Sequence, residues 1–169
     1  PGTDVADERE AARAVAAAAG AVHVEVEVTA ADFWRYLPAI VAAMDDPAAD
    51  YAIVPTYLLA RQAARDVKVV LTGEGGDELL AGYGRYRTAL RPWPFGKQPW
   101  RSHKLAEIDV LRAAPRDWRK GIAEIETQVA ANGFRGLEAL QAADCAAWLP
   151  NDLLAKLDRC LMAHGLEGR

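Results

Sequence analysis

The first 90 residues carry a pattern of apolar positions that alternates between helical and strand-like spacing. Residues 7–19 begin with acids, continue in alanine and stop at Gly20, which predicts a helix with a charged first turn. Residues 22–28 alternate strictly between valine and polar side chains, which predicts a half-buried strand near a sheet edge. Residues 67–71 are almost wholly apolar, which is typical of a central parallel strand covered on both faces.

Two further helices are predicted between these strands. Residues 29–32 resemble a capping box, with Asp32 in place of the usual glutamate, and apolar residues continue at helical spacing to Met44. Pro38 lies inside this pattern, so we expect a kink or a break there. The second helix is expected from about residue 55 to residue 65, because proline is tolerated in the first turn of a helix.

The later part of the chain carries only helical patterns. A helix is expected over residues 79–90, whereas the three prolines of residues 91–100 exclude regular structure there. Helical spacing then recurs over residues 104–113, 117–131, 134–148 and 152–164, with breaks expected at Pro115, Asn132–Gly133 and Pro150. The predicted fold class is therefore α/β. We expect a partial doubly wound parallel sheet in residues 1–90, followed by an all-helical segment in residues 91–169 that continues the same domain.

Composition and charge narrow the class of protein. Apolar residues make up 51% of the chain and the net charge is −4, which suits a globular protein and argues against a broad basic face for nucleic acid. No apolar run approaches the roughly 20 residues that span a bilayer, and the first residues lack the pattern of a signal peptide. Two cysteines are too few for a disulfide framework or a zinc site. We therefore expect a cytoplasmic protein with neither a nucleic-acid nor a membrane partner.

The stretch from Thr72 to Glu78 carries the clearest chemical signal. It follows the predicted buried strand and holds three glycines and two acids within five residues before a helix begins. Glycines let backbone N–H groups approach an anion, and Asp77 could hold Mg²⁺ on a bound phosphate. The alternative is a plain glycine-rich turn, because the first turn of a helix favours acids in any case. The spacing fits neither a Walker loop nor a dinucleotide fingerprint.

Residues 69–86, VVLTGEGGDELLAGYGRY, closely resemble the signature loop and helix of the synthetase domain of glutamine-hydrolysing asparagine synthetases. Asp46-Pro47 and residues 55–59 resemble the preceding loop and helix of that family. A second block starts at Asp144 and runs through WLP and DLLAKLDR to MAHGLEGR at residue 169. Residues 91–135 match least well. The resemblance implies a fold like that of the adenine nucleotide alpha-hydrolases.

Some parts of the family pattern are missing from this sequence. The chain lacks the serine-glycine-glycine pyrophosphate loop, the glutaminase domain with its nucleophilic cysteine, and the downstream Val-Pro-Phe-Leu-Asp stretch and catalytic lysine. Leu80-Ala81 replaces the more usual Phe-Gly. We therefore interpret the chain as a fragment truncated at both ends, and we expect the fragment by itself to be inactive.

The resemblance implies a reaction and a set of site residues. The family uses ATP and Mg²⁺ to adenylate the aspartate side-chain carboxylate, and ammonia from a glutaminase domain of the same full-length chain then displaces AMP. Glu74 would deprotonate the attacking nitrogen, and Asp77 would bind Mg²⁺. Glu78 would brace the helix start. The nucleotide would contact Thr72, Gly73, Gly75 and Gly76. A homodimer is one option for the assembly.

Further candidates each have a simpler explanation. Asp144 would face the substrate or would be a solvated helix carboxylate. Lys156 and Arg159 share one helix face and would reach a phosphate or the substrate, or would pair with nearby Asp152 or Asp158. The acids at positions 45, 46 and 50 miss the spacing of an EF-hand, and we interpret them as a turn that starts the next helix.

Two other functions remain open from the sequence. A related synthetase-type enzyme could act on another carboxylate, as in β-lactam synthetases and peptide cyclases. The chain could also be a non-catalytic interaction module that retains only the shape of the loop.

Overall fold

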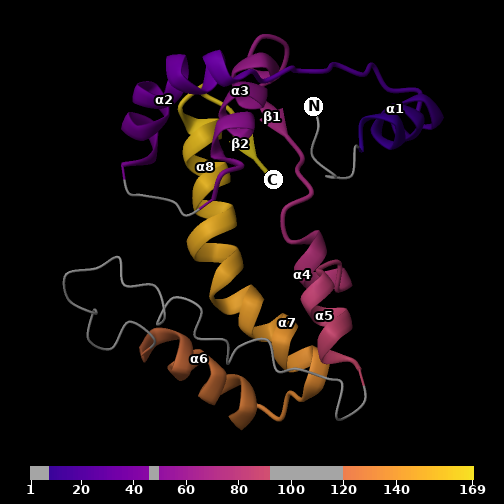
Figure 1. The fold of residues 1–169 in the computed structure, drawn as a ribbon, viewed down its shortest axis with the longest axis vertical. Coiled ribbons are helices and arrows are strands. Elements are labelled where there is room, and N and C mark those ends of the chain that lie inside the picture. The colour runs from indigo at the N-terminus through magenta and orange to yellow at the C-terminus, as the bar shows by residue number, and fades with distance from the viewer. Residues whose placement is uncertain (1–7, 46–49, 92–119) are drawn as a thin grey trace.

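The computed structural model describes residues 8–45, 50–91 and 120–169, and within these ranges helices dominate. In chain order the elements are α1 (Arg9–Ala18), α2 (Ala30–Met44), α3 (Ile53–Ala63), β1 (Val69–Val70), α4 (Gly76–Leu80), α5 (Gly84–Ala89), α6 (Lys120–Ala131), α7 (Gly136–Ala146), the π-helical turn η2 (Leu149–Leu153), α8 (Leu154–Met162) and β2 (Glu167–Gly168). Figure 1 shows α7 and α8 following one another along the long axis, with α2, α3 and the strands around the far end of α8. None of the described helices is long and apolar enough to cross a membrane.

The strands β1 and β2 form a parallel pair, with Val69 opposite Glu167 and Val70 opposite Gly168. The pairing extends past both strands, because the amide of Thr72 donates to the carbonyl of Arg169 at 3.0 Å. A parallel sheet is therefore present, whereas the doubly wound sheet stays a prediction. The predicted covering of β1 on both faces is not seen among the described residues, where Val69 is 48% exposed.

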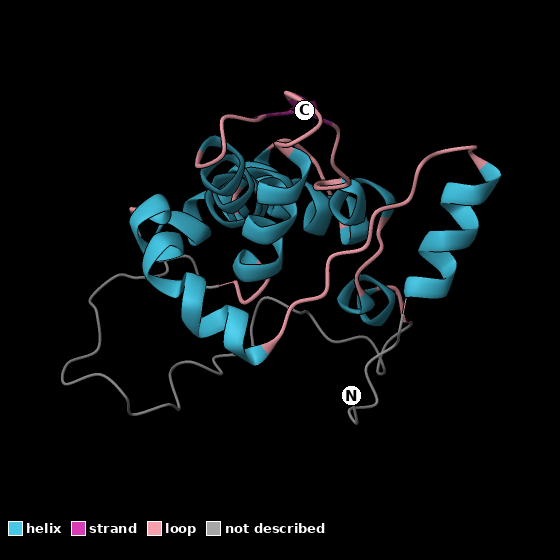
Figure 2. Cartoon of the chain, turned by 90° about the horizontal axis from the view of Figure 1, so that it is seen from above, coloured by secondary structure: helices cyan, strands magenta, loops and turns pink. Residues whose placement is uncertain are grey.

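The predicted strand over residues 22–28 is wrong. These residues pair with no other strand in the described part of the chain, and Val22 is 93% exposed. Only Val26 packs against the apolar core, as a partly buried neighbour. Figure 2 shows this stretch as a long loop that joins α1 to the rest of the chain. Alternation predicts a half-buried surface, but a strand also needs a partner for its backbone hydrogen bonds.

Helix α2 begins at the predicted capping box. The hydroxyl oxygen of Thr29 accepts from the Asp32 amide at 3.1 Å, and the Thr29 amide donates to the Asp32 carboxylate at 3.0 Å. The break expected at Pro38 does not occur, because α2 continues to Met44 with the proline inside it. Pro38 lies on the exposed side of the helix, where water can satisfy the carbonyl that loses its partner.

Two other predicted boundaries differ from the structure. The helix expected over residues 79–90 is split into α4 and α5, because Ala81 adopts a left-handed conformation (φ 57°) that ends α4. The break expected at Pro150 is absent: η2 carries the proline in its first turn and joins α7 to α8. The predicted helix over residues 104–113 and the break at Pro115 lie outside the described residues.

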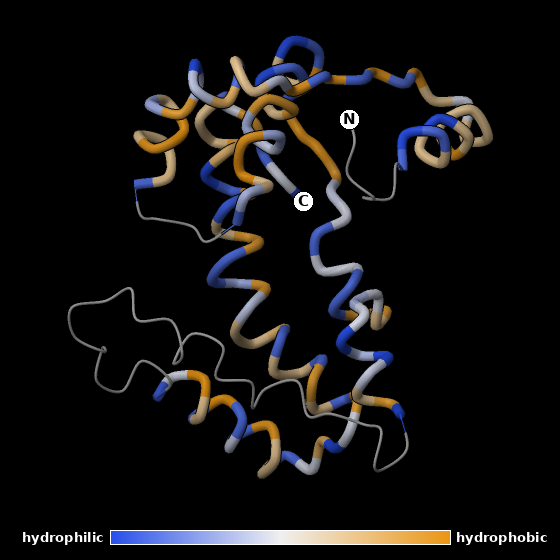
Figure 3. The backbone as a smooth tube through the Cα atoms, in the orientation of Figure 1, coloured by the Kyte–Doolittle hydropathy of each residue, from blue (hydrophilic) through white to orange (hydrophobic). Residues whose placement is uncertain are grey.

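The apolar core surrounds α8. One cluster joins α2, α3 and α8 and contains Ile40, Met44, Val54, Tyr57, Leu58 and Cys160. A second cluster contains Ala60, Leu161 and Leu166, with Val70 of β1 packed against it. In Figure 3 the apolar residues of α3, α8 and β1 lie close together. The last helix of the chain therefore shares its core with elements from residues 30–70, and it supports the loop that follows β1. The predicted division at residue 90 stays a prediction.

Candidate functional site

The loop from Leu71 to Gly76 bends sharply between β1 and α4. Gly75 has a φ of 90°, a conformation that favours glycine, and the amide of Gly76 donates to the carbonyl of Gly73 at 3.0 Å. A Cβ atom on Gly75 would meet the side chain of Leu149 at 3.5 Å. The bend is therefore supported from behind by η2.

The backbone donors of this loop fall into two groups. The amides of Thr72 and Gly76 are already used, by the carbonyls of Arg169 and Gly73. The amides of Gly73, Glu74 and Gly75 make no hydrogen bond within the described part of the chain, and of these residues Gly73 is exposed. Two of the predicted nucleotide-binding residues therefore offer hydrogen-bond donors that no other described residue uses: the amide of Gly73 and the hydroxyl of Thr72. A third, Gly75, is buried.

A cavity of about 380 Å³ opens beside the loop, between α3, β1 and α8. Thr72, Gly73 and Glu74 line it on one side, together with Thr56. Its remaining lining is apolar and consists of Leu59, Ala60, Ala63, Val70, Leu157 and Leu161. The Thr72–Glu74 side of the bend therefore borders an open space, whereas Gly75 is packed against Leu149.

Glu74 pairs with Lys156, which in turn pairs with Asp50. Its Oε1 atom lies 3.2 Å from the ammonium nitrogen of Lys156, which also donates to Oδ2 of Asp50 at 2.7 Å. The side chains are largely enclosed, with exposed fractions of 3% for Lys156, 13% for Asp50 and 25% for Glu74. We call this group the Lys156 triad. The predicted pairing of Lys156 with Asp152 or Asp158 is not the one observed.

The triad shifts the pKa of two of its members. Burial alone would raise the pKa of Asp50, but hydrogen bonds from Lys156 and from the Ala52 amide hold it below its ordinary value. Burial alone would lower the pKa of Lys156, but its hydrogen bonds to Asp50 and Glu74 raise it. Oδ1 of Asp50 also accepts from the Ala52 amide at 2.8 Å, in a turn that precedes α3, as the turn interpretation predicted.

The triad should stabilise the fold over a defined pH range. Because the pKa of Asp50 is lowered on folding, the contribution of Asp50 to stability is present above pH 3.8 and is lost as the pH falls below that value. Because the pKa of Lys156 is raised on folding, the contribution of Lys156 to stability is present below pH 10.5 and is lost as the pH rises above that value. We expect the difference in unfolding free energy between wild type and Lys156→Met, from urea titrations, to be largest between these limits. A difference that does not change from pH 3 to pH 12 would contradict this.

Asp77 is exposed at the start of α4, close to the glycine loop. Its carboxylate occupies the place of a missing side chain, because a Cβ on Gly82 would lie 1.8 Å from Asp77 Oδ1. Among the described residues, no three His, Cys, Asp or Glu side chains are grouped to hold a metal ion. Asp77 could thus supply a single oxygen ligand, as in sites where Mg²⁺ is also held by phosphates and water.

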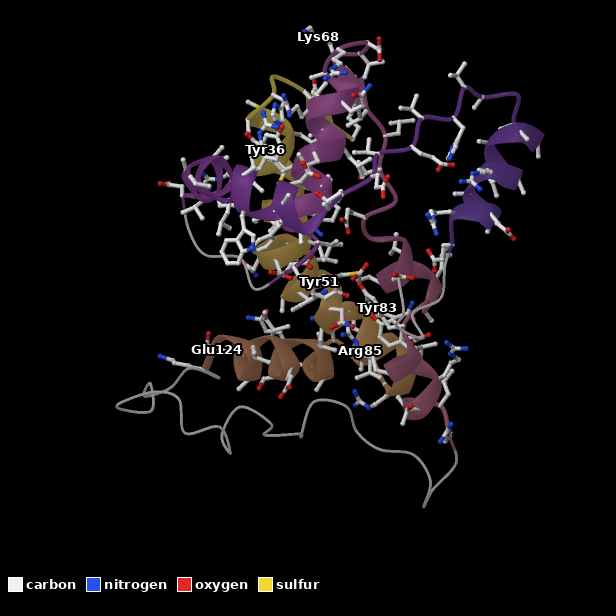
Figure 4. All side chains as sticks on the ribbon, turned by 45° about the horizontal axis from the view of Figure 1, so that its top comes forward. Tyr36, Tyr51, Lys68, Tyr83, Arg85 and Glu124 are labelled. Carbon is white, nitrogen blue, oxygen red and sulfur yellow. The ribbon has the colours of Figure 1, made fainter. Side chains whose placement is uncertain are left out.

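Asp144 is buried in an ion pair, so the interpretation as a solvated helix carboxylate is wrong. It is 1% exposed, and its Oδ2 accepts from Arg85 at 2.7 Å and from the hydroxyl of Tyr86. Burial and the bond to Asp144 raise the pKa of Tyr86. The guanidinium of Arg85 also lies over the ring of Tyr83, 4.3 Å from its centre, and Figure 4 shows the two side chains together. A second cavity, of about 450 Å³, borders Arg85 and Asp144.

Glu78 connects α4 to the residue that precedes α5, and its role at the helix start stays a prediction. It is fully buried and accepts from the Tyr83 hydroxyl at 2.7 Å. The side chain of Gln141 in α7 donates to the carbonyls of Glu78 and Leu79 at 2.8 and 2.9 Å. Arg159 lies 3.7 Å from Asp45, and both side chains are exposed, so its contact with a phosphate or the substrate stays a prediction.

Sequence reasoning missed Asp50, Arg85, Tyr86 and Gln141 as partners of the site. Asp50 is separated from Lys156 by 106 positions, and Arg85 from Asp144 by 59. No local spacing rule connects residues at such separations. The signal that was available was the charge of Lys156 and Asp144 within helices that otherwise look half-buried.

Comparison with known proteins gives a consistent picture. The sequence pattern of the asparagine synthase family matches residues 2–169. A putative glutamine-hydrolysing asparagine synthetase of Mycobacterium tuberculosis is 32% identical over 96% of this chain and 31% of its own length. Asparagine synthetase [glutamine-hydrolyzing] 1 of Bacillus subtilis is 27% identical over 96% of this chain and 32% of its own length.

A putative asparagine synthetase of Methanocaldococcus jannaschii is 29% identical over 59% of this chain and 16% of its own length. The chain thus spans about a third of the length of the bacterial relatives. No solved structure matches.

Proposed function

Because the chain belongs to the asparagine synthase family, we propose that it is part of an ATP-dependent ligase that converts the aspartate side-chain carboxylate into an amide. In the first step the carboxylate attacks the α-phosphorus of ATP and pyrophosphate leaves. In the second step ammonia, derived from glutamine, attacks the activated carbonyl and AMP leaves. The nitrogen must lose a proton to complete the second step, so a base near the carbonyl is required.

Glu74 is the residue that we assign as this base. Its Oε1 atom is held by Lys156, and its Oε2 atom accepts no hydrogen bond within the described part of the chain. It lines the cavity next to Gly73, whose free amide can meet a phosphate oxygen. This placement of a carboxylate and an anion donor at one cavity wall is the observation that supports the proposal most strongly.

The residues present fit the two implied ligands in part. The Gly73 and Glu74 amides and the Thr72 hydroxyl would contact the phosphates of ATP, whereas the enclosed Gly75 and the bonded Gly76 amide would shape the bend. Asp77 would bind Mg²⁺, which neutralises phosphate charge when bound. The rest of the phosphate site, the glutaminase activity and the cytoplasmic location remain predictions for the full-length protein.

The substrate is tested by ATP–pyrophosphate exchange with the full-length protein that carries this chain. Radiolabelled pyrophosphate should enter ATP when aspartate and Mg²⁺ are present, because the first step is reversible. Glutamate, N-acylated amino acids and no acid serve as the comparison arms. Exchange that requires an acid other than aspartate would favour the β-lactam synthetase-like or cyclase alternative. The absence of exchange with every acid would favour the interaction module.

A further inference from the structure

Lys156 holds a place in the site that substrate binding does not explain. Its ammonium is enclosed, with 3% of the side chain exposed, and two carboxylates already accept its hydrogen bonds. It is absent from the residues that line the cavity, whereas Glu74 lies on the cavity wall. An ammonium in this position would therefore act on a ligand in the cavity only through Glu74.

The three members of the Lys156 triad come from three separate elements. Asp50 precedes α3, Glu74 lies in the loop after β1, and Lys156 lies in the first turn of α8. Asp50 is itself held in the turn before α3 by a hydrogen bond from the Ala52 amide. The ammonium thus contacts Asp50, which precedes α3, on one side and Glu74 of the glycine-rich loop on the other. A glycine-rich loop needs such a tie, because glycines leave the backbone many accessible conformations.

We propose that Lys156 is a positioning residue that, anchored by Asp50, ties one oxygen of Glu74 and turns the other toward the nitrogen nucleophile. The proposal rests on the proposed function, because it assigns Lys156 to the amide-forming step. The adenylation step does not use Glu74 as a base, so it should depend little on Lys156. A positioning role therefore lowers amide formation but not adenylation, whereas a general effect on the fold lowers both.

The test compares the two half-reactions in Lys156→Met. In the full-length protein we expect amide formation to fall about 10²-fold, the scale typical of a misplaced reacting group, with aspartate-dependent pyrophosphate exchange within about threefold of wild type. Lys68→Met is the matched control, since Lys68 is exposed and precedes β1 at the end away from the loop. If Lys156→Met does not fold, as judged by circular dichroism, Lys156→Gln carries the same comparison.

A double-mutant cycle identifies the residue through which Lys156 acts. Adding Lys156→Met to Glu74→Gln should not lower the rate of amide formation further, because the Glu74 carboxylate that Lys156 positions is already absent. If the losses of amide formation in the two single variants add in the double variant, the proposal is overturned. It is also overturned if Lys156→Met loses pyrophosphate exchange and amide formation equally. Unchanged amide formation in that variant would overturn it as well.

A readout without activity separates this proposal from the proposed function. Hydrogen–deuterium exchange of a peptide that covers residues 71–76 should be faster in Lys156→Met than in wild type. Unchanged exchange of this peptide would overturn the positioning role even in an active enzyme. A wild-type protein without aspartate-dependent chemistry would overturn the proposed function, and with it the assignment of Lys156 to amide formation.

Discussion

Replacing Glu74 by glutamine is expected to lower amide formation by about 10²- to 10⁴-fold, the range typical of a lost general base. Glutamine has nearly the same size and keeps an oxygen that Lys156 can contact, so the shape of the bend should persist. It cannot accept a proton from the attacking nitrogen at neutral pH. Because adenylation needs no base at this position, aspartate-dependent pyrophosphate exchange should survive in the same variant.

The measurement follows both half-reactions in the full-length protein, with ammonium salts as the nitrogen source so that glutaminase activity does not intervene. Glu124→Gln is a suitable control, because Glu124 is exposed on α6 and far from the loop (Figure 4). Amide formation at the wild-type rate in Glu74→Gln would show that the base is another residue. Loss of exchange together with amide formation would show that Glu74 acts in adenylation or in folding.

Replacing Asp144 by alanine should destabilise the fold by about 2–4 kcal/mol. The substitution leaves the fully buried Tyr86 hydroxyl without its acceptor and the guanidinium of Arg85 without its counter-ion. The expected loss lies below that of a completely buried pair, because 36% of the Arg85 side chain is exposed and water can compensate there. Urea unfolding followed by circular dichroism measures the change.

Two companion variants make the Asp144 result specific. Asp144→Asn keeps an oxygen for Tyr86 and removes only the charge, so its loss should be about half as large. Asp158→Ala, on the exposed side of α8, should change stability by less than about 0.5 kcal/mol. An Asp144→Ala protein as stable as wild type would mean that the ion pair only offsets its own desolvation.

Local signals in the sequence predicted the local structure well. The capping box at Thr29 and Asp32 requires only residues three positions apart, and α2 begins there. The apolar run at Val69 and Val70 followed by glycines likewise predicted a strand that leads into a bend, and both are present. Such features depend on neighbours within a few positions, which a single sequence displays directly.

Features that depend on distant partners could not be predicted. The valines of residues 22–28 have the spacing of a strand, yet pairing is decided by whether another backbone lies alongside. The predicted neighbours of Lys156 lie within four positions of it along the chain, whereas Asp50 and Glu74 reach it from other elements. Asp144 shows the same limit, because Arg85 and Tyr86 bury a carboxylate that a helical pattern places in solvent.

The π-helical turn at Leu149–Leu153 determines in which direction each side chain of α8 points relative to α7. Its closing bond runs from the Leu154 amide to the Leu149 carbonyl, five positions back, so this turn holds one residue more than an α-helical turn. Since each α-helical residue advances the azimuth by about 100°, the extra residue swings the faces of α8 by that angle relative to α7. A register without this insertion would aim Lys156 along a different direction from Glu74, so the widened turn aligns the ammonium of one helix with a carboxylate 82 positions earlier in the chain.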